Sequence, residues 1–305
     1  MTTDDRLETD APAVSVSIIL PAKNESAGLG ALLARIRQVV PTAELVLVDD
    51  GSSDTTPQIA LEHGARVISH PYSLGNGAAV KAGARAATGV VLIFMDADGQ
   101  HDPADIPRLL AKLESGYDMV VGARSDESQA NWGRGLANRL YNRLASYMTG
   151  HPIADLTSGF RAVRAALFRP FLYLLPNGFS YPTTITMAFF RAGYVVAYEP
   201  IRAGRRIGKS HISPLNDGLR FLLIIFKVGT LYSPLKLFVP IAAFHGVVGL
   251  GYYVFTYATQ QRISLATLFL LSSAVTIFLI GLVSEQITQL MYKDSLAKNS
   301  ASERD

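Results

Sequence analysis

Two aspartates separated by one residue, Asp96 and Asp98, are the side chains in this sequence best placed to do chemistry. They follow an apolar run from Val90 to Met95, which predicts a strand buried on both faces of a parallel sheet. Open α/β sheets bind ligands at the carboxyl ends of such strands. With Gln100, the two carboxylates offer the hard oxygen ligands that Mg²⁺ and Mn²⁺ take. The alternative is an acidic turn, because Asp and Gly are common after strands for backbone reasons alone.

Polar residues also follow the first two predicted strands. The first strand ends at Pro21 and leads into Asn24 and Glu25, and the second ends in the pair Asp49 and Asp50. An acid after the second strand can hydrogen-bond a ribose in nucleotide-binding folds, but it can also stabilise a turn before the next helix. The first turn, PAKNESAG, lacks the G-x-G-x-x-G pattern of dinucleotide sites, so a nicotinamide or flavin enzyme is not indicated.

Alternating strand and helix patterns position these side chains. Apolar runs predict strands at 14–20, 44–48, 66–69, 90–95 and 119–121. Helical periodicity and capping residues predict helices at 29–39, from Pro57 onward, at 78–87 and at 103–113. This alternation predicts a doubly wound, mostly parallel α/β sheet within residues 14–213. Residues 1–13 are acidic and polar, unlike a cleaved signal peptide, and are expected to form a disordered leader.

Basic residues become frequent between Gly122 and Ser210. A single arginine usually lies on a solvated surface, but two stretches here combine cations with glycine and hydroxyl residues. They are Thr157 to Arg161, and the stretch from Arg205 to Ser210, which contains Arg206 and Lys209. Such combinations suit phosphate oxygens, because they supply bidentate guanidinium groups, backbone N–H groups and hydroxyl donors.

The last third of the chain is much more apolar. Residues 235–257 contain Lys236 as their only charged side chain, and residues 265–283 contain none. Each segment can cross a hydrocarbon layer of about 30 Å, so we expect two transmembrane helices within 234–292 and a tail at 293–305. Residues 214–233 interleave basic and apolar side chains, which predicts an amphipathic helix in the membrane interface; a buried soluble helix is the alternative.

Charge and composition narrow the possible classes further. Seven Lys or Arg and one acid lie between Arg202 and Lys236, whereas the hairpin tip carries only Arg262. The positive-inside rule therefore predicts that the α/β domain and the C-terminal tail face the cytoplasm, at the cytoplasmic membrane. The absence of Cys excludes disulfides, thiolate zinc sites and a cysteine nucleophile. A formal net charge of +3 is too small to indicate nucleic acid as a partner.

Five stretches, taken in order, resemble the family 2 glycosyltransferases of the GT-A fold. Within that family they resemble the polyprenyl-phosphate glycosyltransferases, such as dolichol-phosphate mannosyltransferase and its bacterial undecaprenyl-phosphate relatives. The stretches are Pro21 to Glu25, Val48 to Asp54, Leu74 to Gly77, Asp96 to His101, and Thr157 to Arg161. The resemblance covers essentially all of residues 14–213, and a two-span tail recurs in the family. It implies transfer of a sugar from a UDP- or GDP-sugar to a polyprenyl phosphate, with Mg²⁺ or Mn²⁺, by a homo-oligomer.

The resemblance also implies roles for single residues. Asp98 would bind the metal, with Asp96 and Gln100 beside it. The nucleotide and its phosphates would meet Pro21, Asn24, Glu25, Asp49, Asp50, Asp96 and Lys209. The remaining catalytic positions, which hold phosphate or acceptor, would be Arg124, Arg134, Asp155, Arg161, Arg205 and Arg206. One departure leaves part of the acceptor region open: many relatives carry a carboxylate after Gly-Phe-Ser, where this chain has Ser180 to Thr184.

A polyprenyl phosphate is already an anion, so it needs cations to position it and no general base. The many arginines and the lack of a clear base therefore favour a single displacement with inversion. One alternative is a processive polysaccharide synthase, although the chain lacks a Gln-x-x-Arg-Trp motif, its only Trp being Trp132, and two spans cannot enclose a pore. The other alternative is a non-catalytic membrane scaffold, although decay of the site would be expected to remove the acidic clusters.

Overall fold

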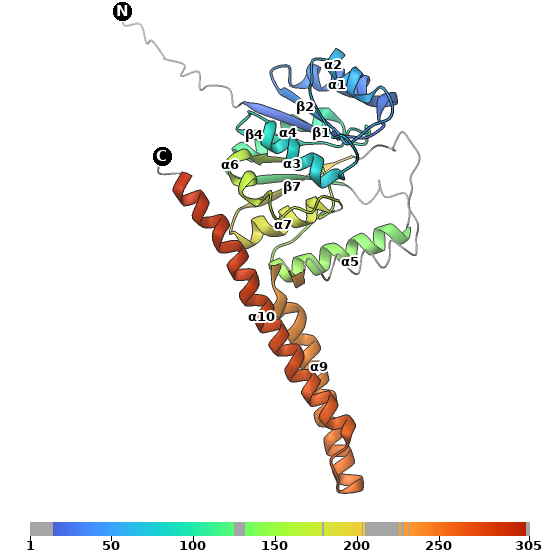
Figure 1. Ribbon diagram of the computed structural model, residues 1–305, viewed down its shortest axis with the longest axis vertical. Coiled ribbons are helices and arrows are strands. Elements are labelled where there is room, and N and C mark those ends of the chain that lie inside the picture. Colours follow the sequence, from blue (N-terminus) through green and yellow to red (C-terminus); the bar gives the residue numbers. More distant parts are fainter. Residues whose placement is uncertain are drawn as a thin grey trace, which may run out of the picture.

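In the computed structural model, an α/β domain sits at one end of a long helical hairpin (Figure 1). The structure describes residues 15–124, 132–178, 180–202, 204, 226, 229–230 and 232–302, with the backbone alone at 132–138 and 292–302. The strands are β1 Val16–Ala22, β2 Glu44–Asp49, β3 Arg66–Ser69, β4 Val91–Phe94, β5 Met119–Arg124, β6 Arg161–Arg164 and β7 Val196–Ile201. The helices of the domain are α1 Ser26–Val39, α2 Thr56–Glu62, α3 Asn76–Ala86, α4 Ile106–Glu114, α5 Trp132–Thr149, α6 Ala165–Phe168 and α7 Tyr181–Arg191, with short 3₁₀ turns η1 Pro103–Asp105 and η3 Arg169–Phe171.

The seven strands form one sheet in the order β3-β2-β1-β4-β6-β5-β7. Strand β1 runs parallel to both β2 and β4, with Ile18 opposite Leu45 on one side and Ile93 on the other. Strand β6 runs antiparallel to its two neighbours, β4 and β5, while β5 and β7 are parallel. The expected α/β class with a mostly parallel sheet is therefore confirmed, with one antiparallel strand inserted near its centre.

Side-chain alternation along the strands explains why helices cover both faces of the sheet. In β1, Ile18 packs in a core with residues of α1 and α4, whereas its neighbour Ile19 packs in a second core with residues of α3 and α7. All four residues of β4 are buried, as a strand covered on both faces requires. The result is the doubly wound arrangement that the alternating sequence pattern predicts.

The observed boundaries differ from the expected ones in specific places. Strand β1 continues through Pro21 to Ala22, which is possible because proline at this position still allows extended backbone. The expected helix at 103–113 is a 3₁₀ turn followed by α4. Strands β6 and β7 had no counterpart in the prediction. The expected leader at 1–13 lies outside the described residues, as does most of the expected interfacial helix at 214–233, of which residues 226, 229, 230 and 232 are helical.

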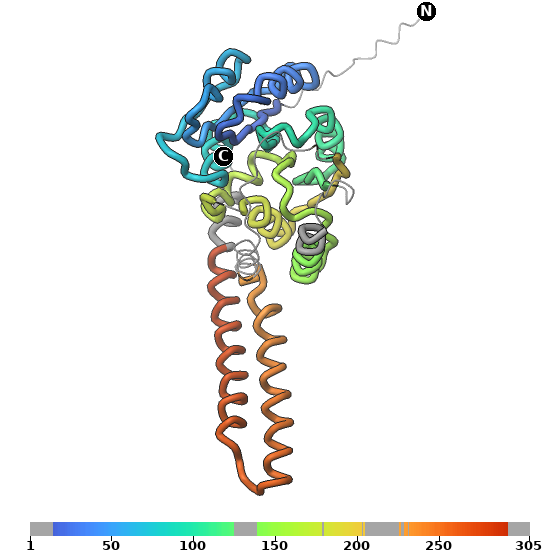
Figure 2. Tube along the Cα trace, turned by 90° about the vertical axis from the view of Figure 1, so that its right-hand side faces the viewer, coloured from blue at the N-terminus to red at the C-terminus, as the bar shows by residue number. Residues whose placement is uncertain are grey.

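Two long helices, α9 (Pro234–Gln260) and α10 (Leu265–Ser302), form the hairpin and run side by side away from the domain (Figure 2). Each contains a 27-residue stretch that is long and apolar enough to cross a membrane, and little of its most apolar part is buried. Such exposure is unlike the core helix of a soluble protein. The expected tail at 293–305 is helical up to Ser302, because α10 continues without a break along the side of the domain (Figure 1).

Candidate active site

The carboxyl ends of β2, β1 and β4 lie next to one another, because these strands are parallel neighbours in the sheet. The chain after β1 and the chain after β2 are directly joined at this edge. Ser53 donates its backbone N–H to Oδ1 of Asn24 at 2.8 Å, and Asn24 donates its own N–H to the hydroxyl of Ser52 at 2.9 Å. Asn24 adopts a left-handed φ of 56°, which asparagine tolerates better than most residues. The structure thus brings together the two polar turns that were predicted to face a nucleotide.

Asp96 and Asp98 lie in the loop that follows β4, and both are partly exposed. Gln100 donates its backbone N–H to Oδ1 of Asp98 at 3.1 Å, which closes a tight turn around the second carboxylate. Gly159 approaches the first carboxylate so closely that a methyl group there would lie 2.9 Å from Oδ2 of Asp96. We refer to residues 96–100 as the carboxylate loop and to residues 155–160 as the Gly159 loop.

The donor set of the carboxylate loop fits a hard divalent cation. Two aspartates and a glutamine offer oxygen atoms only, which suits Mg²⁺ or Mn²⁺. Within the described ranges, no group of three or more His, Asp or Glu side chains gathers to form a complete cage. A site with so few protein ligands suits a cation that takes its remaining ligands from water and from substrate phosphates.

We expect Gly159→Ala to weaken metal use without unfolding the protein. The added methyl group would displace the Asp96 carboxylate, and such changes beside a metal ligand typically cost about 10- to 100-fold in metal affinity or activity. The measurement is the Mn²⁺ concentration that gives half-maximal turnover. Gly28→Ala is the matched control, because a methyl group on Gly28 would meet no atom within 4 Å. If Gly159→Ala needed no more Mn²⁺ than the natural chain, the close approach of Gly159 would not position the Asp96 carboxylate for the metal.

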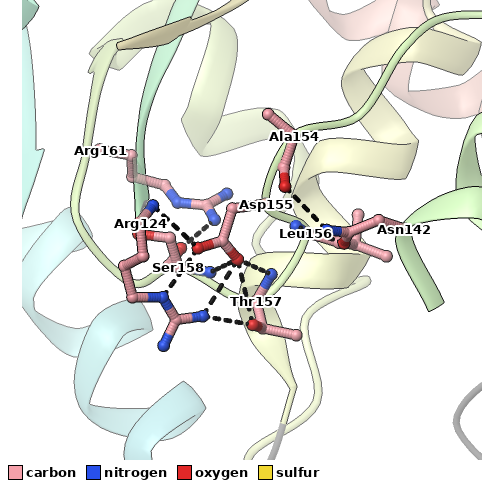
Figure 3. A network of polar contacts seen from close by, with 8 residues as sticks. All are labelled: Arg124, Asn142, Ala154, Asp155, Leu156, Thr157, Ser158 and Arg161. Carbon is pink, nitrogen blue, oxygen red and sulfur yellow. Dashed lines mark hydrogen bonds and ion pairs between the residues drawn. The ribbon is translucent and has the colours of Figure 1, made fainter. Parts of the chain in front are cut away.

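Arg124 and Asp155 form a bidentate ion pair beside the Gly159 loop (Figure 3). Nε and Nη2 of Arg124 donate to the two carboxylate oxygens at 2.7 and 3.0 Å, and Nη2 also donates to Thr157 Oγ1 at 2.6 Å. Oδ1 of Asp155 further accepts the backbone N–H groups of Thr157 and Ser158. Burial raises the pKa of Asp155, but the hydrogen bonds from Arg124 outweigh it and hold the pKa below its usual value. Asp155 thus stays ionised and orders the Gly159 loop around Arg124.

Sequence reasoning missed two residues that support this region. Asn142 of α5 donates its side-chain N–H to the carbonyl of Ala154 and accepts the N–H of Leu156, so it brackets Asp155 (Figure 3). His101 is buried and stacks on Phe160, with ring centroids 5.1 Å apart. Burial lowers the pKa of His101 to about 4, so the ring is neutral at pH 7. The sequence around Asn142 contains no pattern that points to this role. His101 ends the stretch Asp96 to His101 that carries the family resemblance, but the sequence does not show that its ring is buried.

Arg161 is a correction to the predicted phosphate ligands. It begins β6, a strand between two others, and its side chain is fully buried on the face that α7 covers. Its guanidinium donates to the carbonyl oxygens of Ser158 and Pro182 and to Thr186 Oγ1. Since protein acceptors hold both Nη groups and no solvent reaches the side chain, Arg161 positions the Gly159 loop against α7 and is not placed to contact a substrate phosphate.

The two acids at the end of β2, Asp49 and Asp50, both serve the protein's own loops. Oδ1 of Asp49 accepts the N–H of Ser52 at 2.9 Å, so the alternative of a turn-stabilising carboxylate holds for this residue. The buried Asp50 carboxylate accepts hydrogen bonds from His70, Ser73 and the backbone N–H groups of Leu74 and Gly75. Burial raises the pKa of Asp50, but these four donors outweigh it and lower the pKa to about 2. Asp50 therefore fixes the loop that leads into α3, and its contact with a nucleotide stays a prediction.

We expect Asp50→Asn to lower the free energy of unfolding by about 2 kcal/mol, because the amide leaves buried donors without an acceptor. The stabilisation from Asp50 is present above its ordinary pKa of 3.8 and is lost as the pH falls toward about 2. Melting temperatures in detergent between pH 7 and pH 3 should therefore drop less steeply in the variant than in the natural chain. Asp102→Asn, at an exposed aspartate, is the control. If the melting temperature fell equally with pH in the Asp50 variant and in the natural chain, Asp50 would not be the source of this stabilisation.

The other predicted site residues lie in less informative places. Pro21 is half-buried in β1, and Glu25, at the start of α1, donates its N–H to Thr56 Oγ1. Arg134 belongs to α5, where only the backbone is described, and Arg205, Arg206 and Lys209 lie outside the described residues. Gly204, which directly precedes Arg205 in the chain, donates its N–H to the carbonyl of Gln100 at 2.8 Å. The chain directly before the basic stretch is therefore fixed on the carboxylate loop.

Comparisons with known proteins identify the family of this chain. Residues 17–171 match the glycosyl transferase family 2 model, and residues 233–290 match that of the GtrB C-terminal hairpin. A dolichyl-phosphate hexose transferase from Haloferax volcanii is 31% identical over 215 residues, which cover 70% of this chain and 93% of the relative. Glucosyl-3-phosphoglycerate synthase from Mycobacterium tuberculosis has a similar fold. Its complex with phosphoglyceric acid gives a TM-score of 0.58 at 21% identity over 71% of this chain and 79% of the synthase. Its complex with Mn²⁺, UDP and glucosyl-3-phosphoglycerate gives 0.57 at 22% identity over 71% and 78%. The chain belongs to glycosyl transferase family 2, as a glycosyltransferase of the polyprenyl-phosphate type.

Proposed function

We propose that this protein is a membrane-bound, metal-dependent glycosyltransferase that moves one sugar, with inversion, from a nucleotide diphosphate sugar to a polyprenyl phosphate. The observation that carries the proposal is the bond from Gly204 to the carboxylate loop. From that bond the chain runs on through the basic stretch at 205–209 into the apolar hairpin. One chain thus carries, in sequence order, a loop that suits a diphosphate, basic residues that suit a phosphate and a hairpin that suits a membrane.

The donor side of the proposal rests on the carboxylate loop. Asp96, Asp98 and Gln100 would hold Mg²⁺ or Mn²⁺, and Asn24, Glu25 and the pair Asp49–Asp50 line the same sheet edge, where the nucleoside would lie. When bound, the cation neutralises charge that develops on the departing diphosphate. The fold neighbour that binds Mn²⁺ with UDP supports this class of donor, and the choice between UDP and GDP is one that the experiment below makes.

The acceptor side rests on cations without a general base. His101 directly follows the carboxylate loop, and its pKa of about 4 makes it a poor base at neutral pH. A phosphate acceptor needs no base, because one of its anionic oxygens attacks the anomeric carbon while the bond to the nucleoside diphosphate breaks. Arg124, Arg134, Arg205, Arg206 and Lys209 would hold the phosphates of donor and acceptor in line for that attack.

The hairpin and α5 support a membrane location. α5 lies across the base of the domain, close to where the hairpin begins (Figure 1). Tyr141 and Met148 of α5 face the protein, whereas Leu140 and Tyr147 are exposed together with Arg143. Basic and apolar side chains on one outward face are typical of a helix that lies in the membrane interface. We place the domain and the end of α10 on the cytoplasmic side, with 214–233 as a second interfacial helix, and propose a homo-oligomer.

The direct test incubates the purified full chain with UDP- and GDP-sugars, undecaprenyl or dolichyl phosphate, and Mg²⁺ or Mn²⁺. We expect release of nucleoside diphosphate from one donor only, and only when both the lipid phosphate and the cation are present. Equal release without the lipid phosphate would contradict the acceptor, and no release from any donor would favour the scaffold alternative. A processive synthase would instead release several nucleotides for each acceptor molecule.

We expect replacement of Arg205 and Arg206 by methionine to impair the lipid acceptor selectively. Loss of charge-assisted bonds to a phosphate raises KM for the lipid by about tenfold or more, while KM for the donor changes less. The measurement is steady-state transfer with each substrate varied in turn. Arg35→Met on the exposed face of α1 is the control. An unchanged KM for the lipid would remove both arginines from the acceptor site.

A further inference from the structure

The α/β domain and the hairpin meet at a junction built around one ion pair. Arg191, in the last turn of α7, donates through Nη2 to Oε1 of Glu285 in α10 at 3.3 Å. The side chains of Arg191 and Glu285 are only 16% and 14% exposed. The guanidinium also lies 6.0 Å from the ring centroid of Tyr232, itself packed against α5. The pair therefore ties three parts of the chain together: α7, α10 and the segment before α9.

Glu285 is the only charged residue between Leu265 and Met291, the apolar stretch of α10. An ionised residue in such a stretch is costly unless it is paired, and it marks function more often than stability. It lies twenty residues beyond the start of α10, which at 1.5 Å per residue is about 30 Å from the hairpin tip. That is the thickness of one hydrocarbon core, so Glu285 falls at the membrane surface on the side of the domain.

Helix α7 connects this pair to the active site. At its first turn, Tyr181 donates its hydroxyl to the carbonyl of Gly159 at 3.0 Å, and Gly159 packs against the carboxylate of Asp96. At its last turn, Arg191 binds Glu285. The helix between them has eleven residues, so it spans about 16 Å. A rigid element thus joins the carboxylate loop to a point on the hairpin at the membrane surface.

Three further hydrogen bonds lie at the junction. Lys236 donates to the carbonyl of Met148 at 2.9 Å, Tyr173 donates to the carbonyl of Met291 at 2.7 Å, and Thr288 donates to the carbonyl of Thr230 at 3.1 Å. Each of these is a single hydrogen bond to a backbone carbonyl, made by a side chain with rotatable bonds. Among the described residues of the junction, the ion pair is the contact that joins two charged side chains with little exposure to solvent, and Oε2 of Glu285 also accepts the N–H of Leu235 at 3.5 Å.

We infer that Arg191 and Glu285 are positioning residues that set the height and tilt of the active site over the membrane, so that a lipid-held phosphate reaches the sugar donor. The pair contacts neither substrate. It acts through α7, which contacts the Gly159 loop through Tyr181, and its effect falls on acceptors that the membrane holds in place. This inference rests on the proposed function for its acceptor, but the orientation of the domain can be measured without any turnover.

Orientation is the first readout. The chain has no Cys, so Leu61→Cys in α2 and Ile263→Cys at the hairpin tip, both exposed, take a unique pair of spin labels. In lipid nanodiscs we expect one narrow distance distribution for the labelled chain and a broader one when Arg191→Met or Glu285→Gln is added. The double variant should be no broader than either single variant, because both remove the same interaction. Arg262→Met at the hairpin tip, which removes an arginine away from the junction, should leave the distribution narrow. Equal distributions in all variants would overturn the inference.

Turnover is the second readout, with two acceptors that carry the same phosphate chemistry. A misplaced site costs on the order of 100-fold per Å, so kcat/KM for undecaprenyl phosphate in nanodiscs should fall at least about tenfold in each single variant. A short-chain, water-soluble prenyl phosphate can reach the site from any side, so its kcat/KM should stay unchanged. Equal losses with both acceptors would assign the pair to general stability and overturn the inference. If the natural chain uses neither acceptor, the proposed function fails, while the spin-label distances still decide the role of the pair.

Discussion

Asp98→Asn is expected to abolish sugar transfer while the protein keeps its fold. The carboxylate is partly exposed in the carboxylate loop, and it accepts the N–H of Gln100, a bond that an amide oxygen can also accept. Loss of a negatively charged ligand removes several kcal/mol of charge stabilisation at the departing diphosphate, which corresponds to about 1,000-fold or more in kcat. The measurement is transfer at saturating donor, acceptor and Mn²⁺, next to a melting curve in detergent.

Asp102→Asn is the matched control for this variant. Asp102 lies four residues further on, at the start of η1, where it caps the turn by accepting the N–H of Ala104 at 2.9 Å. Asparagine caps such turns equally well, so both turnover and melting temperature should stay close to those of the natural chain. Substantial turnover by Asp98→Asn, or equal losses in the two variants, would remove Asp98 from the metal site.

The second large effect is expected at the Arg124–Asp155 pair. Asp155→Asn places an amide where one carboxylate now binds a guanidinium and two backbone N–H groups, and it leaves Arg124 without a counter-charge. Removing one partner of a buried pair costs about 3 to 5 kcal/mol, and the 28% exposure of Arg124 places this pair at the lower end of that range. Because the same contacts order the Gly159 loop against Asp96, turnover should fall together with the melting temperature. Arg124→Lys should not preserve either, since a lysine cannot make the bidentate bond.

A more exposed arginine pair in the same domain is the control for this experiment. Arg108 donates to Asp105 and Glu199, but half of its side chain is exposed to solvent. Exposed pairs contribute about 1 kcal/mol or less, so Arg108→Lys should change the melting temperature slightly and leave turnover intact. If Asp155→Asn behaved like Arg108→Lys, the Gly159 loop would not depend on the buried pair.

Sequence reasoning predicts the parallel part of the sheet well, because its strands are strong local signals. The run before Asp96 and the run before Asp49 are apolar and end abruptly in acids, and β4 and β2 lie where these runs predict. The strand order then brings the polar turns to one edge. Strand β6 could not be predicted in the same way, because Arg161 and Arg164 make up half of its four residues.

The roles of charged residues were harder to predict than their positions. Arg161 and Asp50 lie in stretches typical of phosphate and nucleotide sites, but their partners are distant in sequence: α7 for Arg161, and the residues at 70–75 for Asp50. The local sequence around a charged residue does not show whether protein groups or a ligand will pair with it. The pair Arg191 and Glu285 was invisible for the same reason, since 94 residues separate its members.

In the proposed reaction, a nucleotide sugar and a lipid phosphate meet at the carboxylate loop to give a lipid carrying one sugar. Mass spectrometry and NMR of the lipid product from the full chain, undecaprenyl phosphate, Mn²⁺ and the accepted donor test it most directly. We predict a single species with one hexose on the phosphate and an anomeric configuration opposite to that of the donor. A ladder of longer sugar chains, a retained configuration or a sugar attached elsewhere than on the phosphate would contradict the account.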